Sequence, residues 1–175
     1  MELHFLYTLQ ELHNPILDKI MIFITTLGNG GIFWICLGLV LAVIPKTRKC
    51  GLCMLLSMAL TYIVGNLILK NIVARPRPFT VATEIALKIP QPGEYSFPSG
   101  HTMNAFTAAT TIFLFYRKQG IAALVLATLI AFSRMYLFVH YPTDILGGVV
   151  VGIVDALVIF RLTYKKGCVK LNSNK

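Results

Sequence analysis

The chain has 175 residues, of which 56% are hydrophobic and only 13% are charged, whereas soluble globular domains carry about 25% charged residues. Sixteen Lys and Arg residues against seven Asp and Glu residues give a formal charge of +9. This composition excludes a disordered chain and a soluble binder of charged partners, because a domain of this size cannot bury so much apolar surface. The sequence therefore predicts an integral membrane protein with one domain over residues 1–175.

The predicted elements are all helical. Residues 1–26 place leucines at helical spacing beside acidic residues, and Pro15 and the turn Gly28–Gly31 interrupt them, which is typical of an interfacial amphipathic helix. Stretches of about 18 mostly apolar residues mark membrane spans, and five follow, at residues 27–44, 51–69, 99–116, 121–137 and 145–162. The predicted fold class is all-α, an integral membrane bundle of about five transmembrane helices with an N-terminal interfacial helix.

The basic residues predict the orientation of this bundle. Nine of the sixteen lie between spans one and two, between spans three and four, and in the tail 163–175, and a tenth, Arg161, lies at the end of the last span. By the positive-inside rule these segments are cytoplasmic. We therefore expect a multi-pass protein of the plasma membrane with a cytoplasmic C-terminus. Residues 78–98 form an extracytoplasmic loop, which is long enough to cap a site and help to choose the substrate head group.

Four helices carry an ionisable group near the outer edge of the membrane. A helical rise of about 1.5 Å per residue, counted outward from the cytoplasmic basic residues, places Lys70, His101, Arg134 and Asp144 at nearly one depth. Ionisable groups at such positions are energetically costly and indicate a functional site.

The cationic residues at this depth are suited to phosphate. Lys70, Arg77 and Arg134 carry the fixed positive charges that neutralise a phosphate group and its transition state. Ser99 and Gly100 lie at the predicted start of a helix, where free backbone N–H groups and the helix dipole favour an anion. The sequence therefore predicts a phosphate-binding site.

The histidines supply the chemistry. Pro142 suits the first position of a helix, which places Asp144 in its first turn and His140 just before it. Asp144 then accepts the Nδ1 proton of His140 and leaves Nε2 free to attack phosphorus, while His101 protonates the leaving oxygen. No sequence pattern typical of a magnesium or zinc site is found, so neither a metal nor a cofactor is expected. The four cysteines are interpreted as small residues of membrane helices.

These residues occur in three motifs. Residues 70–78, 98–101 and 133–144 match in order and spacing the signature motifs of the type 2 phosphatidic acid phosphatase (PAP2) superfamily, so the chain resembles a short bacterial member of that family. The resemblance implies a metal-independent membrane lipid phosphatase with a PAP2/haloperoxidase-like core and an outward-facing site. It implies a phosphohistidine at His140, Asp144 as its relay and His101 as the acid. It also implies phosphate binding by Lys70, Arg77, Ser99, Gly100 and Arg134.

The substrate is left open by these motifs, because they recognise phosphate and not the lipid tail. The compact chain is similar to bacterial members that act on undecaprenyl diphosphate, which is the first expectation. Phosphatidate, diacylglycerol pyrophosphate and phosphatidylglycerophosphate are the alternatives. A non-enzymatic lipid-phosphate binding or transport protein would not need the two histidines, and a vanadate haloperoxidase would be soluble. Expected partners are a membrane lipid phosphate and the bilayer, and no nucleic acid; the oligomeric state is open.

Several other polar residues have more than one interpretation. Arg75 is expected to contact lipid head groups at the interface, with a substrate contact as the alternative. Asn66 either supports Lys70 or bonds to a neighbouring helix. Asp155, inside the last span, is interpreted as a hydrogen-bonded residue of the bundle. An outer aromatic belt is predicted from Tyr95, Phe97, Tyr136 and Tyr141, with a place at the mouth of the site as the alternative for a few of them.

Overall fold

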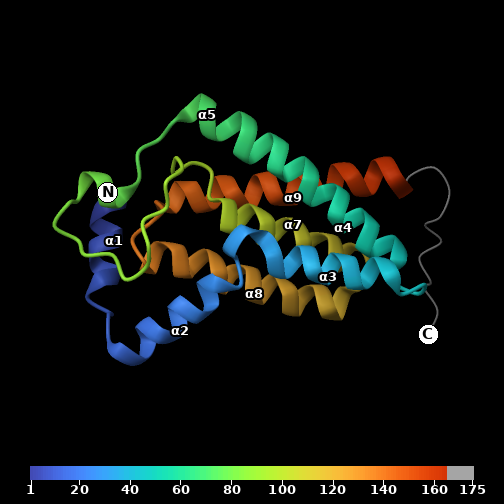
Figure 1. Ribbon diagram of the computed structural model, residues 1–175, viewed down its shortest axis with the longest axis horizontal. Helices are drawn as coiled ribbons and strands as arrows, with labels where there is room; N and C mark the ends of the chain where they lie inside the picture. Colours follow the sequence, from blue (N-terminus) through green and yellow to red (C-terminus); the bar gives the residue numbers. More distant parts are fainter. Residues whose placement is uncertain (165–175) are drawn as a thin grey trace.

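A computed structural model describes residues 1–164, which form a helical bundle closed at one end by a long loop (Figure 1). In chain order the elements are α1 (Glu2–Gln10), α2 (Pro15–Thr26), the 3-10 turn η1 (Asn29–Gly31), α3 (Ile32–Val43), α4 (Arg48–Thr61), the π-helical η2 (Tyr62–Leu69), α5 (Lys70–Val73), α6 (Pro78–Val81), α7 (Gly100–Phe115), α8 (Arg117–Tyr136) and α9 (Pro142–Tyr164). No strand occurs within residues 1–164, and the prediction of an all-α fold is confirmed.

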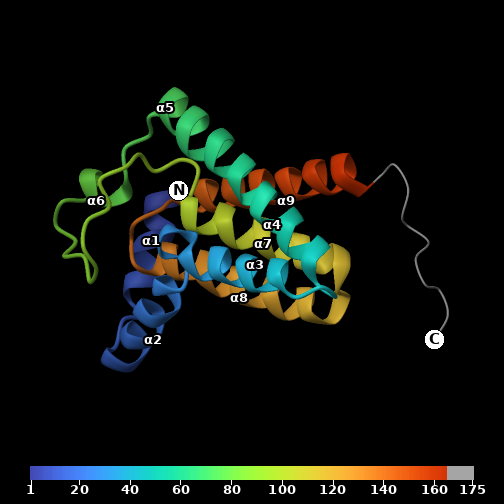
Figure 2. The same cartoon turned by 45° about the vertical axis from the view of Figure 1, so that its right-hand side comes forward.

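Helix α7 lies at the centre of the bundle, in contact with α3, α4, α8 and α9 (Figures 1 and 2). Small residues allow these neighbours to approach closely. A Cβ atom at Gly120 would lie 2.2 Å from the Cα atom of Phe113, and one at Gly152 would lie 2.7 Å from the carbonyl oxygen of Met103. Such backbone contacts are typical of helices that pack within a membrane, where dispersion contacts replace the hydrophobic effect.

The protein is a multi-pass membrane protein. Helical segments long and apolar enough to cross a membrane are Pro15–Val43, Arg48–Val81, Arg117–Tyr136 and Pro142–Tyr164. The first differs from the prediction, because α3 has only 12 residues, about 18 Å, and reaches spanning length only together with α2, which we had placed in the interface. The predicted span 99–116 corresponds to α7, which has 16 residues, about 24 Å, and is surrounded by the others.

The N-terminal helices lie across the end of the bundle that carries the long loop (Figure 2). Pro15 occupies the first position of α2 and Asn14 caps it, a common way to begin a helix. Leu6 and Leu9 of α1 are buried against Phe138. Helix α1 is therefore part of the packed structure rather than a separate interfacial helix. Of the predicted cytoplasmic tail, residues 165–175 lie outside the described residues.

A buried polar network joins three helices below the site. The hydroxyl of Thr61 in α4 donates to Oδ2 of Asp155 in α9, over 2.9 Å, and lies 2.8 Å from the hydroxyl of Thr107 in α7. Asp155 is thus a hydrogen-bonded residue of the bundle, as predicted. Buried polar groups of this kind are stable only when they are satisfied.

The predicted aromatic belt is wrong for two of its members. Tyr136 and Tyr141 are buried. Tyr136 stacks on His13, with ring centroids 4.1 Å apart, and donates a hydrogen bond to Asp18 over 2.7 Å. Tyr95, by contrast, is 47% exposed. Because tyrosine combines an apolar ring with a polar hydroxyl, it suits a membrane interface and a packed helix end equally well.

Candidate active site

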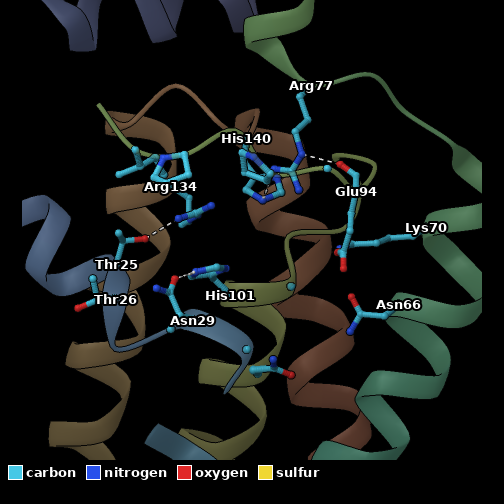
Figure 3. A pocket seen from close by; sticks show the side chains of 18 of the residues that line it. Thr25, Thr26, Asn29, Asn66, Lys70, Arg77, Glu94, His101, Arg134 and His140 are labelled. Atoms are coloured by element: carbon cyan, nitrogen blue, oxygen red, sulfur yellow. Dashed lines mark hydrogen bonds and ion pairs between the residues drawn. The ribbon is translucent and has the colours of Figure 1, made fainter. Parts of the chain in front are cut away.

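A cavity of about 540 Å³ lies at the end of the bundle, where α2, η2, α7 and α8 meet the loop 82–99 (Figure 3). It brings together six of the predicted site residues: Lys70, Arg77, Gly100, His101, Arg134 and His140. Pro90, Pro92 and Glu94 of the loop line it from the other side. The long loop therefore covers the cavity, at the position where we expected a cap.

Two of the three cations are carried by the segment that leaves the bundle after η2. Lys70 begins α5, and Ala74, in the left-handed conformation with a φ of 45°, ends it. The chain then turns, so that Arg77 enters the cavity from the side opposite to Arg134 (Figure 3). Both Lys70 and Arg77 are buried. A π-helical stretch such as η2 often lies next to a functional site because it shifts the register of the following residues.

The start of α7 forms another part of the cavity wall. Gly100 carries no side chain, and a Cβ atom there would lie 3.8 Å from Nζ of Lys70. The side chain of Ser99 is buried and accepts a hydrogen bond from the hydroxyl of Thr102 over 3.1 Å, and its part in phosphate binding stays a prediction. The backbone of the helix start, rather than the hydroxyl of Ser99, is thus nearest to the cavity.

Behind the cavity wall lies a group that we call the His140 cluster, composed of Arg75, which is partly exposed, and the buried Ser96, His140, Tyr141 and Asp144. Asp144 accepts hydrogen bonds from Nη1 of Arg75 over 2.7 Å, from the backbone N–H of Tyr141 over 2.9 Å and from the hydroxyl of Ser96. Its Oδ2 lies 3.5 Å from Nδ1 of His140. Asp144 is therefore held by three donors besides the histidine, and does not itself line the cavity.

The contacts of His140 fix its tautomer. Nη1 of Arg77 lies 3.1 Å from Nε2 of His140. Because a guanidinium group only donates hydrogen bonds, Nε2 must accept, and the ring proton lies on Nδ1, toward Asp144. Burial lowers the pKa of His140 to about 3, although Asp144 acts in the opposite direction. The imidazole is therefore neutral at physiological pH, with its Nε2 lone pair directed to the cavity side.

A second group, the His101 cluster, is composed of Thr25, Asn29, His101 and Arg134 (Figure 3), together with Gly28, which packs against His101. Nη1 of Arg134 donates to the hydroxyl of Thr25 over 2.6 Å, and Nε2 of His101 lies 2.9 Å from Oδ1 of Asn29. Nε of Arg134 is buried and has no hydrogen-bond partner among residues 1–164. An unpaired buried guanidinium N–H is costly, so this cluster retains the capacity to bind an anion.

Glu94 is a site residue that the sequence analysis did not identify. Its carboxylate pairs with Nζ of Lys70, and its carbonyl oxygen accepts a hydrogen bond from Nε of Arg77 over 2.6 Å. The hydrogen bond from Lys70 lowers the pKa of Glu94, so the carboxylate is ionised at neutral pH. Glu94 thus binds two of the three cations, Lys70 through its carboxylate and Arg77 through its carbonyl oxygen.

Arg75 has different contacts from those that we expected. We had placed it at the lipid head groups, but its guanidinium group binds Asp144 and Glu2, the latter over 2.6 Å, and lies 3.9 Å from the centroid of the Tyr141 ring. The only sequence signal was an arginine two residues before Arg77. Asn66 lines the same cavity as Lys70, consistent with the first of its two interpretations.

The donors of the cavity are not those of a metal centre. Within residues 1–164 no group of three or more His, Cys, Asp and Glu side chains could hold a metal ion. Cys36, Cys50 and Cys53 are free thiols, and Cys168 lies outside the described residues. Independence of a metal stays a prediction, which a chelator tests below.

Comparison with known proteins gives consistent results. The model of the PAP2 superfamily matches residues 51–168. Undecaprenyl-diphosphatase of Sulfolobus acidocaldarius is 32% identical over 137 residues, covering 78% of this chain and 66% of that protein. Undecaprenyl-diphosphatase BcrC of Bacillus subtilis is 34% identical over 154 residues, covering 86% of this chain and 77% of that protein.

A solved structure extends this similarity to the fold. The crystal structure of a transmembrane PAP2 type phosphatidylglycerolphosphate phosphatase from Bacillus subtilis superposes with a TM-score of 0.78 at 28% identity, covering 97% of this chain and 87% of that one. The family model matches more than half of the chain, and both relatives are more than 30% identical to it. The chain therefore belongs to the PAP2 superfamily and is a membrane phosphatase of that family.

Proposed function

We propose that the protein removes the terminal phosphate from a lipid phosphate or diphosphate at the outer leaflet, with undecaprenyl diphosphate as the first candidate substrate. The observation that carries the proposal is the combination of a neutral His140 with a cationic cavity in which Nε of Arg134 has no partner among the described residues. A phosphate group supplies the missing acceptor for that nitrogen. Its negative charge also balances Lys70, Arg77 and Arg134.

In the first step, Nε2 of His140 forms a bond to phosphorus while the bond from phosphorus to the leaving oxygen breaks. The electron pair of that bond stays with the leaving oxygen, which takes a proton from the protonated ring of His101 and leaves that ring neutral. Asp144 stabilises the positive charge that develops on the His140 ring, because its Oδ2 lies 3.5 Å from Nδ1. The product is a phosphohistidine and a dephosphorylated lipid, or a lipid monophosphate when the substrate is a diphosphate.

In the second step, water attacks the phosphohistidine and His101 accepts a proton from that water. Inorganic phosphate leaves, and His140 returns to its neutral state. The cations at the cavity stabilise the equatorial oxygens in both transition states. Microscopic reversibility gives His101 the role of acid in one step and base in the next.

An outward-facing cavity is supported by the basic residues at the other ends of the helices. Arg48 begins α4, Arg117 begins α8 and Arg161 lies in the last turn of α9. Lys70, Arg134 and Asp144 lie at the opposite ends of these same helical segments. The positive-inside rule favours a cytoplasmic location for the basic ends, which supports a cavity and a loop 82–99 that face outward.

The choice of substrate rests on the relatives. The two sequence relatives that we compared are both named undecaprenyl-diphosphatases. Phosphatidylglycerophosphate is the second candidate, because the solved phosphatidylglycerolphosphate phosphatase superposes over 97% of this chain. A protein that only binds or transports lipid phosphates would not need a histidine held by a buried carboxylate.

Phosphate release from the purified protein in detergent tests the proposal. The substrates are undecaprenyl diphosphate, phosphatidylglycerophosphate, phosphatidate and diacylglycerol pyrophosphate, each with EDTA present. We expect release by the wild type, with undecaprenyl diphosphate turned over fastest, and none by His140→Ala. His4→Ala, which removes an exposed histidine outside the cavity, is the matched control and should retain wild-type activity.

Three results would contradict parts of this proposal. No release from any of the four lipids would refute the lipid phosphatase, and loss of release on addition of EDTA would refute independence of a metal. Unchanged release by His140→Ala would refute the nucleophile. Size-exclusion profiles and circular dichroism of the variants show whether loss of activity reflects loss of folding.

A further inference from the structure

The turn between α2 and α3 contacts His101. This turn lies outside the residues that the PAP2 family model matches. That match begins at residue 51, whereas the turn comprises Gly28 and η1. Oδ1 of Asn29 lies 2.9 Å from Nε2 of His101. A Cβ atom at Gly28 would lie 2.6 Å from Cδ2 of His101, so only glycine leaves room for the ring at that position.

This contact determines where the proton of His101 lies. A carbonyl oxygen of an amide side chain only accepts hydrogen bonds, so Nε2 of His101 carries the proton. Among the described residues, Asn29 is the one hydrogen-bond partner of the His101 ring. The other polar groups around the ring include the cations Arg134, Arg77 and Lys70, none of which can accept a proton from it.

We propose that Asn29 is a positioning residue: by accepting the Nε2–H of His101, it orients the ring so that Nδ1 of the protonated imidazole donates to the leaving oxygen. This inference rests on the proposed function, in which His101 is the acid. Without an acceptor at Asn29, the ring rotates, its Nδ1 no longer faces the leaving oxygen, and less of the protein is ready to donate. The N-terminal segment of the chain then contributes directly to catalysis, beyond the three motifs.

The inference predicts a dependence on the leaving group. An alkoxide needs a proton as the bond to phosphorus breaks, whereas p-nitrophenolate is stable as an anion and needs none. A residue that acts only on the acid therefore matters for octyl phosphate and not for p-nitrophenyl phosphate. A residue that merely supports the fold matters equally for both.

The experiment compares kcat/KM for these two substrates in purified variants. We expect Asn29→Leu, which keeps the size of the side chain and removes its acceptor, to lower kcat/KM for octyl phosphate about 10- to 100-fold and for p-nitrophenyl phosphate less than about threefold. Asn29→Asp retains an acceptor and should recover most of this loss. Asn71→Leu, at an exposed asparagine bonded to the carbonyl of Leu67, is the matched control and should change neither value.

His101→Ala completes the test. It should show the same selective loss, and adding Asn29→Leu to it should cause no further loss, because the two residues act as one unit. Equal losses for both substrates in Asn29→Leu, no loss for octyl phosphate, or additive losses in the double variant would overturn the inference. If the wild type hydrolyses neither substrate nor any of the lipids, the proposed function fails first, and this inference fails with it.

Discussion

The two histidines of the cavity are held in opposite ways. In the His140 cluster, the ring is 2% exposed, accepts from Arg77 at Nε2 and faces a carboxylate that three other groups hold in place. In the His101 cluster, within residues 1–164, the ring has one hydrogen bond, to Asn29, and the side chain of its neighbour Arg134 has one, to Thr25. Nε2 therefore carries a lone pair in His140 and a proton in His101.

This difference suggests separate tasks for the two clusters on either side of the cavity. The proposed nucleophile, His140, is oriented by protein groups alone, so in this account it is ready before the substrate arrives. In the His101 cluster, by contrast, Nε of Arg134 has no hydrogen-bond partner among the described residues. A bound anion would supply that partner. We therefore expect changes in the His140 cluster to lower kcat, and changes on the side that receives the anion to alter KM.

The largest effect is expected for Asp144→Asn. The substitution keeps the shape of the side chain but removes its charge, and its amide group favours the wrong tautomer of His140. A comparable change in a Ser-His-Asp triad lowers kcat about 10⁴-fold, and we expect a loss of about 10³- to 10⁴-fold here. Initial rates of phosphate release measure it, with the exposed Glu11→Gln as control. A loss of less than tenfold would show that Asp144 does not stabilise the positive charge that develops on His140.

A smaller loss is expected for Arg75→Gln, which removes a donor to Asp144 and the link to Glu2. Loss of a charged hydrogen bond predicts a decrease in kcat of about 10- to 100-fold with little change in KM. Glu2→Gln, which leaves the bond to Asp144 in place, should cost less. A rise in KM at constant kcat would instead show that Arg75 contacts the substrate, which was its alternative interpretation.

Glu94→Gln should act on KM. The carboxylate occupies Lys70, and its side chain is 69% exposed, so it can swing away when a phosphate arrives. Removing this competitor should lower KM, and the inhibition constant of orthovanadate, by up to about fivefold at unchanged kcat. Higher values of both constants would mean that Glu94 helps to bind the substrate. Glu84→Gln, in the same loop, is the matched control.

The smallest effect is expected when pH is varied in the absence of ligand. Because burial lowers the pKa of His140 to about 3, its ring should remain neutral as the pH falls from about 8 to about 5, through the ordinary histidine range near 6.5. Nitrogen-15 chemical shifts in detergent micelles, assigned with His140→Ala, should therefore stay constant. A protonation midpoint near 6.5 would contradict the proposed neutral nucleophile.

The sequence predicted those site residues whose position is set by a regular helix. Lys70, His101, Arg134 and Asp144 were assigned to one depth because the helical rise is constant, and Lys70, His101 and Arg134 line one cavity with Asp144 directly behind it. The start of α9 at Pro142 was also predicted, because proline favours the first position of a helix.

Apart from Arg77 and His140, which belong to the motifs, the site residues that lie in loops and turns were not predicted. Glu94 and Ser96 reach the site only because the loop 82–99 folds back over the cavity, and no periodic pattern marks that path. Asn29 was interpreted only as part of a glycine-rich turn, since its contact with His101 depends on the angle between α2 and α3. Arg75 was misassigned because an arginine near a helix end suits a lipid head group as well as a buried carboxylate.

The most direct test of the account is to trap the phosphoenzyme. The protein is mixed with a substrate labelled with phosphorus-32 in its terminal phosphate, quenched in alkaline detergent within milliseconds and digested. We predict a label that is stable to alkali, labile to acid and carried by the peptide that contains His140, and that is absent from His140→Ala. Active wild-type protein without such a label, or a label that persists in His140→Ala, would contradict the assignment of His140 as the nucleophile.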